Sequence, residues 1–236
     1  MLGVLVNVIT VIAGSLIGLL FKKGIPEKVS NAAMTGIGVC TLYIGIDGSL
    51  CGENVLIAIA SVVIGVIIGT LVDIDGKLDR FAKKVESGFN KGSGISIAEG
   101  LVTATLLFCV GSMTVTGSIQ AGLTGDNSVL YTKATLDLVS SAMLASSLGI
   151  GVLMASVSVF IIQGGLVLLS ELIAPVMNSG AINEMTCVGS LLIIMLGTNL
   201  MGLSKFKVAD FLPAIILAPV IHNLTPFISK LTDIIL

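Results

Sequence analysis

The sequence is poor in the residues from which soluble proteins build their surfaces. It has no tryptophan, a single histidine, 4% aromatic residues and only 11% charged residues in a chain of 236. Soluble domains carry about 25% charged residues. A soluble fold of this length could not cover its surface with so few polar groups. The shortage of charge therefore excludes a soluble domain.

Patterns for catalysis, metal binding and nucleic-acid binding are missing as well. The four cysteines have neither zinc-like nor CxxC spacing, so we expect no metal site and no disulfide. The sequence contains no GxSxG, HExxH or phosphate-loop motif, and no basic cluster with interleaved aromatic residues. We therefore expect a protein that is not an enzyme and has no catalytic residue, no cofactor and no nucleic-acid partner.

Apolar residues and glycine are abundant instead. Hydrophobic residues make up 55% of the chain, 28 residues are glycine and the mean hydropathy is +1.10. A lipid bilayer accepts an apolar outer surface, and small residues let transmembrane helices approach closely. The composition predicts an all-α, polytopic transmembrane bundle, with residues 1–236 forming a single domain. The first apolar run starts at Leu2 without a basic leader, so we expect a membrane helix there and not a cleavable signal.

Apolar runs and helix breakers divide the chain into about eight segments, some of them short, broken or re-entrant. The run at 32–46 is shorter than the ~20 residues of a straight crossing. Residues 134–174 contain no proline and would span ~61 Å as one helix, so we expect them to fold back at Gly149-Ile150-Gly151. The predicted helices are 2–20, 32–46, 54–72, 99–116, 134–148, 152–173, 185–203 and 211–224.

The stretch 73–98 is the only strongly charged part of the chain. Leu78, Phe81, Ala82, Val85 and Phe89 recur in it at helical spacing, with charges between them. This pattern predicts a short amphipathic helix at the cytoplasmic membrane surface. We expect a flexible glycine-containing link at 88–94 to follow it.

The basic residues predict how the chain is oriented. Of the twelve lysines and arginines, ten fall on one side of the predicted topology, and only Lys133 and Lys230 on the other. Because cytoplasmic loops carry the excess of basic residues, both termini should face outward. The expected location is the inner (plasma) membrane.

A weak internal repeat relates the two ends of the chain. A shift of 151 residues aligns Val6, Val8 and Gly14 with identical residues, and also Met34-Thr35 and Gly38. Cys-Val-Gly-Ser at 109–112 and again at 187–190 supports a competing alignment. If the first alignment holds, the first three and last three helices are copies of opposite topology, which is typical of transporters.

Asp137 is the leading candidate for a functional residue. It lies inside a predicted helix, with Ser140 nearby and Lys133 one turn before it. One interpretation is an interfacial ion pair between Asp137 and Lys133. The other is a cation or proton site, because a carboxylate within a membrane is a functional hypothesis by default. The residues leave both open.

Other polar residues lie deep in the predicted helices. Asn7, Gln163 and Asn199 would most simply link helices by hydrogen bonds. The helix at 99–116 carries several hydroxyls and is followed by glycines, which favours a break at Gly111–Gly117. Backbone exposed at such a break is a common way to bind ions. The candidate ion- or substrate-binding set is Asp137, Ser140, Ser112, Gly111, Gly117 and Asn7.

The stretch LLFCVGSMTVTGSIQAGLTGD (106–126), with Leu130-Tyr131-Thr132-Lys133 and the segment 145–152, resembles the membrane family known as domain of unknown function 554. The resemblance covers essentially the whole chain, and it implies a membrane or transport protein without a defined mechanism. Ala121 stands where the family often has Asp, which removes an acidic role there. The resemblance draws attention to Gly111, Ser112, Met113, Gly117, Ser118, Gly122, Gly125, Asp126 and Asp137.

These observations lead to a function hypothesis and an alternative. The first is a homo-oligomeric transporter or channel for a small ion or solute. The alternative is a scaffold or regulator that docks a cytoplasmic partner on the surface of 78–89. An Asp137 without a basic partner at depth would slightly favour a cation over an anion.

Overall fold

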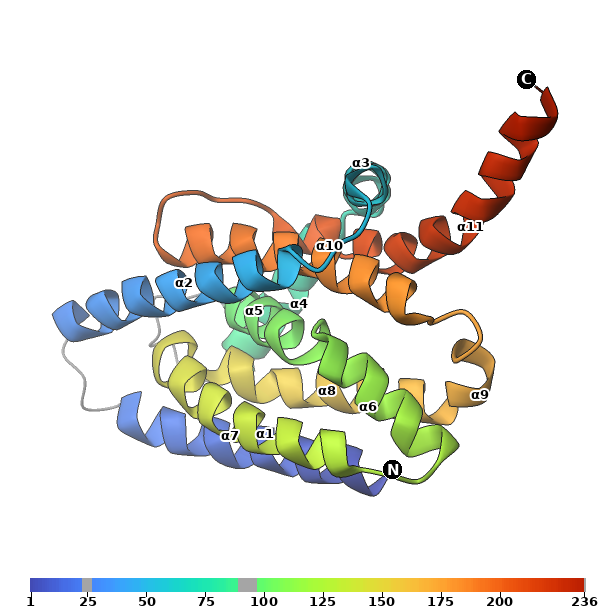
Figure 1. Cartoon of the computed structure of the whole chain (residues 1–236). Coiled ribbons are helices and arrows are strands. Elements are labelled where there is room, and N and C mark those ends of the chain that lie inside the picture. The colour runs from blue at the N-terminus through green and yellow to red at the C-terminus, as the bar shows by residue number, and fades with distance from the viewer. Residues whose placement is uncertain (23–26, 89–96, 236) are drawn as a thin grey trace.

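The computed structural model describes residues 1–22, 27–88 and 97–235, and within these ranges it contains helices and no strand. Figure 1 shows the arrangement. The elements are α1 (Leu2–Lys22), α2 (Glu27–Ser49), α3 (Val55–Val72), α4 (Ile74–Gly88), α5 (Ile97–Cys109), α6 (Ser112–Leu123), α7 (Ser128–Leu148), α8 (Ile150–Leu168), α9 (Ser170–Ile173), α10 (Ser179–Leu200), the 3-10 helix η1 (Val208–Phe211) and α11 (Pro213–Ile235). The prediction of an all-α bundle is confirmed.

The helices form two groups. In the first, α1 packs along α7 and α8, and α6 covers α8. In the second, α2 packs along α10, and α11 contacts both α10 and α3. The helix α5 lies against α8 and joins the groups, because its Val102 and Leu106 share a hydrophobic cluster with Leu192 and Leu196 of α10. The helix α3 is drawn end-on in Figure 1, so it crosses the others steeply.

The helices related by the 151-residue shift pack against one another in opposite directions. The helices α1 and α8 run in opposite senses, as do α2 and α10 (Figure 1). In the third pair, Gly69 of α3 lies against Asp210 and Gly65 against Ala214 at the start of α11. Opposed pairs are the arrangement that an inverted repeat would produce.

Several predicted helix bounds are wrong, because polar residues lie inside helices. The helix α2 has 23 residues and is not short; it includes Asp47 and Gly48, which were predicted to be a loop. The helix α7 begins at Ser128, six residues before the predicted start. The helix predicted at 152–173 divides at Leu169 into α8 and α9. The predicted fold-back is confirmed at Gly149, whose φ of 78° suits glycine.

The predicted break in the fourth segment is confirmed at Gly111 but not beyond it. The helices α5 and α6 meet at a bend of 60°, and Gly111 is the extended residue that precedes α6. The Thr114 hydroxyl donates a 2.8 Å hydrogen bond to the Phe108 carbonyl oxygen across the break. Gly117 lies inside α6, so the break does not extend to it. Instead a side chain there would meet Val129 and Leu130 of α7.

The amphipathic helix predicted within 73–98 is observed as α4. Asp73, with φ of 56°, forms the turn between α3 and α4. On one face Leu78 joins a core cluster. The other face carries exposed ion pairs, Arg80–Asp73 and Lys83–Asp79. Phe89, Lys91 and most of the predicted link at 88–94 lie outside the described residues.

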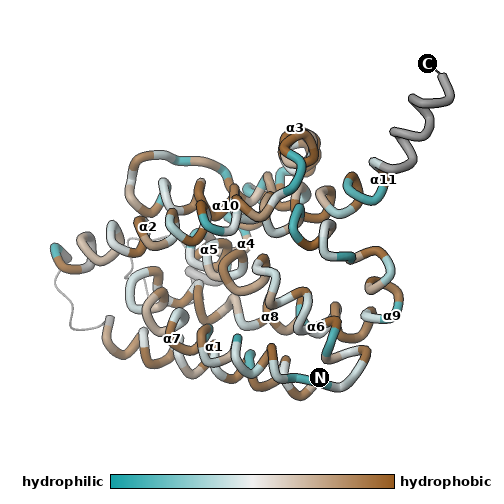
Figure 2. Tube along the Cα trace, viewed as in Figure 1, coloured by the Kyte–Doolittle hydropathy of each residue, from teal (hydrophilic) through white to brown (hydrophobic). Residues whose placement is uncertain are grey.

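Many large hydrophobic side chains are exposed on the outside of the bundle. The tube in Figure 2, coloured by the hydropathy of each residue, is brown along much of its length. Within the described residues, five helices are long and apolar enough to cross a membrane, and a sixth span results if α5 and α6 count as one. The five are α1, α3, α8, α10 and the helical stretch 208–225. The helices α2 and α7 are long enough, with 23 and 21 residues, but more polar.

Candidate functional site

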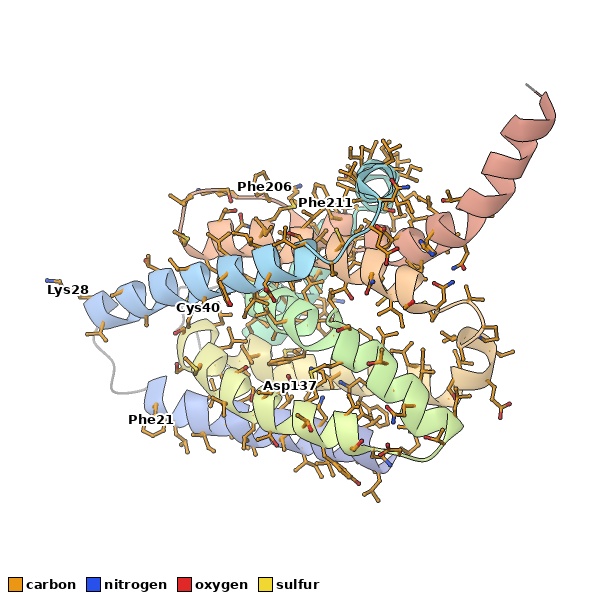
Figure 3. All side chains as sticks on the ribbon, in the orientation of Figure 1. Phe21, Lys28, Cys40, Asp137, Phe206 and Phe211 are labelled. Atoms are coloured by element: carbon orange, nitrogen blue, oxygen red, sulfur yellow. The ribbon has the colours of Figure 1, made fainter. Side chains whose placement is uncertain are left out.

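A buried ion pair lies at the centre of the first group of helices. Lys133 and Asp137 stand one turn apart on α7, and the Lys133 Nζ lies 2.9 and 2.7 Å from the two carboxylate oxygens of Asp137. Each side chain is only 7% exposed. Figure 3 labels Asp137 in the interior of the bundle. The ion pair between Asp137 and Lys133 is therefore confirmed, and Asp137 has a basic partner that is buried with it.

Two amides from neighbouring helices complete this cluster. The Nδ2 of Asn7 on α1 donates to Asp137 Oδ2 at 3.0 Å and to the Oε1 of Gln163 on α8 at 3.2 Å. Both amide side chains are fully buried. Asn7 thus links the ion pair to α8. The four residues Asn7, Lys133, Asp137 and Gln163 are called the polar cluster below.

Part of the hydrogen-bonding capacity of the polar cluster is unused. Within the described residues, Asn7 Oδ1 and Gln163 Nε2 are buried without a hydrogen-bond partner. The hydroxyl of Ser118 on α6 is likewise buried and unpartnered, and α6 packs on both α7 and α8. Buried polar groups are normally satisfied. These open acceptors and donors indicate a place where a solute or water can bind.

Close packing between α1 and α7 positions Asn7 beside Asp137. A Cβ at Gly14 would collide with Ser141 and the Leu138 carbonyl, and one at Gly18 with the backbone of Ala142. At the start of both helices, the Gly3 N–H donates to Asn127 Oδ1 at 2.9 Å. The two helices therefore run side by side in the same direction, which sets Asn7 level with Asp137.

A groove of about 500 Å³ reaches Asp137 from the side of α2. Most of its wall is apolar, and hydroxyl groups come from Thr41, Ser140, Ser146 and Ser147. Cys40, which Figure 3 labels on α2, lies on the same wall. Among the described residues that line this groove, Asp137 is the only charged one. Its full lining is Ala33, Gly36, Ile37, Cys40, Thr41, Ile44, Leu107, Phe108, Asp137, Ser140, Met143, Leu144, Ser146 and Ser147.

The predicted site residues divide into two sets. Asp137 and Asn7 are hydrogen-bonded to each other, and Ser140 lines the groove together with Asp137. Ser112 and Gly111 are exposed at the helix break and do not line the groove. Gly117 packs against α7. Of the six predicted residues, the structure thus brings Asp137, Asn7 and Ser140 together and places the other three elsewhere.

The sequence did not reveal that Lys133 is buried, nor that Gln163 is hydrogen-bonded to Asn7. The spacing of four between Lys133 and Asp137 did reveal the pair. Its burial was hidden because the predicted helix started at Ala134, which put Lys133 in a loop. Gln163 was noted as a deep polar residue, but nothing in the sequence indicated which helix it faces.

A second cavity of about 460 Å³ lies between α4, α5 and the segment before η1. Its wall mixes acidic Asp75, Asp79 and Glu99 with Lys205 and Lys207. Burial, followed by the negative charge of Asp210, raises the pKa of Asp75 above its ordinary value. Asp210 Oδ1 accepts the Asp75 N–H at 2.9 Å. It therefore stabilises the start of α4.

Long apolar helices, a surface helix and a buried polar cluster define an α-helical, polytopic membrane protein. The family described as "Protein of unknown function (DUF554)" matches residues 2–223. The chain belongs to this family, as its 106–126 segment had suggested.

Two relatives match over almost their full lengths. "Uncharacterized membrane protein YdfK" of Bacillus subtilis is 36% identical over 225 residues, covering 94% of this chain and 95% of the relative. "Uncharacterized protein YqgA" of Escherichia coli is 28% identical over 221 residues, covering 92% and 94%. No solved structure matches.

Proposed function

We propose that the protein is a transporter or channel for a small ion or solute in the plasma membrane, with both termini outside. The observation that carries the proposal is the buried Lys133–Asp137 pair beside an open groove. Removing two charges from water costs several kcal/mol per ion, and apolar residues of similar volume are often at least as stable. An ion pair kept inside a membrane bundle therefore favours a functional role over a purely structural one.

The position of the polar cluster supports transport. Asn7 of α1 and Gln163 of α8 are bonded to each other, and these helices correspond under the 151-residue shift. Transporters with inverted repeats place their substrate sites where the repeats meet. The kinked α5–α6 segment packs on the two helices that carry Asp137 and Gln163, since α6 contacts both α7 and α8.

The unit in the membrane is expected to be a homo-oligomer. Only 28% of the residues in the apolar stretch of α3 are buried. The helix α2 exposes Val39 and Tyr43. These apolar surfaces are available to lipid or to a second copy.

The test is flux across liposomes that contain the purified protein. We expect uptake from a panel of inorganic cations and small organic solutes, reduced at least tenfold by Asp137→Asn, since the neutral amide cannot keep the ion pair. Glu171→Gln on α9 is the matched control, because it removes an exposed carboxylate outside the polar cluster. Folded wild-type protein that moves none of these solutes, or equal flux by Asp137→Asn, would contradict the proposal.

The scaffold hypothesis predicts the opposite pattern. The helix α4 exposes Phe81 among its charges, which is the surface that a cytoplasmic partner would use. If that is the function, charge reversal at Lys83 and Lys84 would abolish it in cells and Asp137→Asn would be silent. A transporter requires Asp137 and tolerates changes on the exposed face of α4.

A further inference from the structure

Asp137 belongs both to the polar cluster and to the lining of the groove. Lys133 and Asn7 bind its carboxylate from within α7 and from α1. Asp137 also forms part of the groove wall, together with other residues of α2, α5 and α7. Lys133, Asn7 and Gln163 are not part of that wall. A molecule in the groove would therefore lie against Asp137 without lining contact to Lys133.

The chemistry of the groove selects one class of molecule. Ile37, Ile44, Leu107, Met143 and Leu144 offer apolar surface. The charge and the nearby hydroxyl oxygens of Ser140 and Thr41 are suited to N–H donors. A carboxylate or phosphate would find an anion and no cation on the described wall, and like charges disfavour such binding. The volume of about 500 Å³ falls within the range of small-molecule sites.

We propose that the groove binds a small organic ammonium ion with an apolar body, whose nitrogen replaces the Lys133 ammonium at Asp137. This inference rests on the proposed transport function and names its substrate class. Lys133 then acts as a tethered competitor: it neutralises Asp137 while the groove is empty. It thereby spares the bundle an unpaired buried charge, which would cost several kcal/mol.

Exchange of one ammonium for another conserves the local charge at Asp137 but leaves Lys133 without its partner. The polar cluster has one open acceptor that can receive it, since Asn7 Oδ1 is buried and unpartnered within the described residues. Asn7 Oδ1 belongs to the amide that already donates to Asp137. The site therefore holds one neutral acceptor for the displaced lysine. The remaining cost of its unpaired charge weakens ligand binding, and this cost is absent in Lys133→Met.

The test measures binding alone, with n-butylammonium as the probe on purified full-length protein in detergent, by calorimetry at pH 8. Butan-1-ol and butyrate, of the same chain length, are the comparison ligands. We expect butylammonium to bind at least tenfold more tightly than either. Equal binding of butan-1-ol, or tighter binding of butyrate, would overturn the proposal without any variant.

Three variants locate the site. Asp137→Asn should weaken butylammonium binding at least tenfold. Lys133→Met should strengthen it at least fivefold, because the competitor is gone. Gly36→Leu should abolish it by filling the groove from α2, where a Cβ meets no atom within 4 Å. The third variant leaves the ion pair intact, so it remains informative if the first two fail to fold.

The binding test separates this inference from the proposed function. If other solutes show flux that depends on Asp137 while butylammonium does not bind, the ammonium proposal is overturned and transport stands. If butylammonium binds at Asp137 but no solute is transported, the site stands and the transport proposal is overturned. Weaker binding by Lys133→Met than by wild type would overturn the competitor role of Lys133.

Discussion

At the scale of single residues, the decisive feature is that Lys133 and Asp137 are buried together. Coulomb attraction and hydrogen bonds to the pair offset the cost of taking both charges out of water. Asn7 adds one further bond to Asp137. Removing either charge leaves the other uncompensated, whereas removing both leaves a neutral, slightly under-packed site.

The pair therefore predicts strong coupling between two substitutions. Lys133→Met alone should lower the free energy of unfolding by about 3–5 kcal/mol, and the double variant with Asp137→Asn should recover most of the loss. Thermal or denaturant unfolding in detergent measures this. The control is the exposed pair Lys83–Asp79 on α4, where the same changes should each cost no more than about 1 kcal/mol. Simple addition of the two single effects at 133 and 137 would show that the pair is not coupled.

At the scale of helices, hydropathy and helix breakers predicted the existence of almost every element, and the errors share one cause. The bounds of α2 and α7 were too short because Asp47 and Lys133 were treated as the ends of apolar runs. Both residues are helical, and Lys133 has its partner inside the bundle. A single sequence does not reveal which polar residues are satisfied by a distant helix. For the same reason Gln163 could not be assigned to Asn7, 156 positions away.

The role of a glycine is likewise difficult to predict from a single sequence, because glycine can either break a helix or let two helices pack closely. Gly111 breaks a helix, whereas Gly117 lies within one and lets α6 approach α7. Gly14 and Gly18 are four residues apart, a spacing typical of closely packed membrane helices, and both lie against α7. The partner helix became visible only in the structure.

Close packing of α1 on α7 gives a prediction with an internal control. Gly18→Ala should destabilise the protein by about 1–3 kcal/mol, because its methyl group would overlap the Ala142 carbonyl and the Ser146 backbone. Gly165→Ala on α8 meets no atom within 4 Å. It should be neutral or stabilising by up to about 1 kcal/mol, since alanine favours the helix. Unfolding midpoints in detergent compare the two. Similar effects at both positions would mean that the α1–α7 contact does not require glycine.

At the scale of the whole molecule, the directions of the helices constrain how the chain crosses the membrane. The helices α1 and α7 run in the same direction, whereas α8 opposes α1 and α10 opposes α2 (Figure 1). If the long helices and the α5–α6 pair each cross once, the chain makes eight crossings and both ends emerge on one side. Without a crossing by α3, the same count would make α7 run opposite to α1, whereas the two helices are parallel in Figure 1. The predicted excess of basic residues on one side also favours a crossing by α3.

Labelling of single cysteines in intact cells tests this topology. In a variant whose four cysteines are replaced by alanine, Glu53→Cys and Asp126→Cys should react with a membrane-impermeant maleimide, since they follow α2 and α6 on the predicted outer side. Phe81→Cys on α4 and Lys205→Cys after α10 should react only after the cells are opened. All four positions are exposed. Labelling of Glu53→Cys and Phe81→Cys from the same side would show that α3 does not cross, and it would place the C-terminus opposite the N-terminus. The reverse labelling of all four would leave eight crossings intact but turn the whole protein over, placing both termini in the cytoplasm.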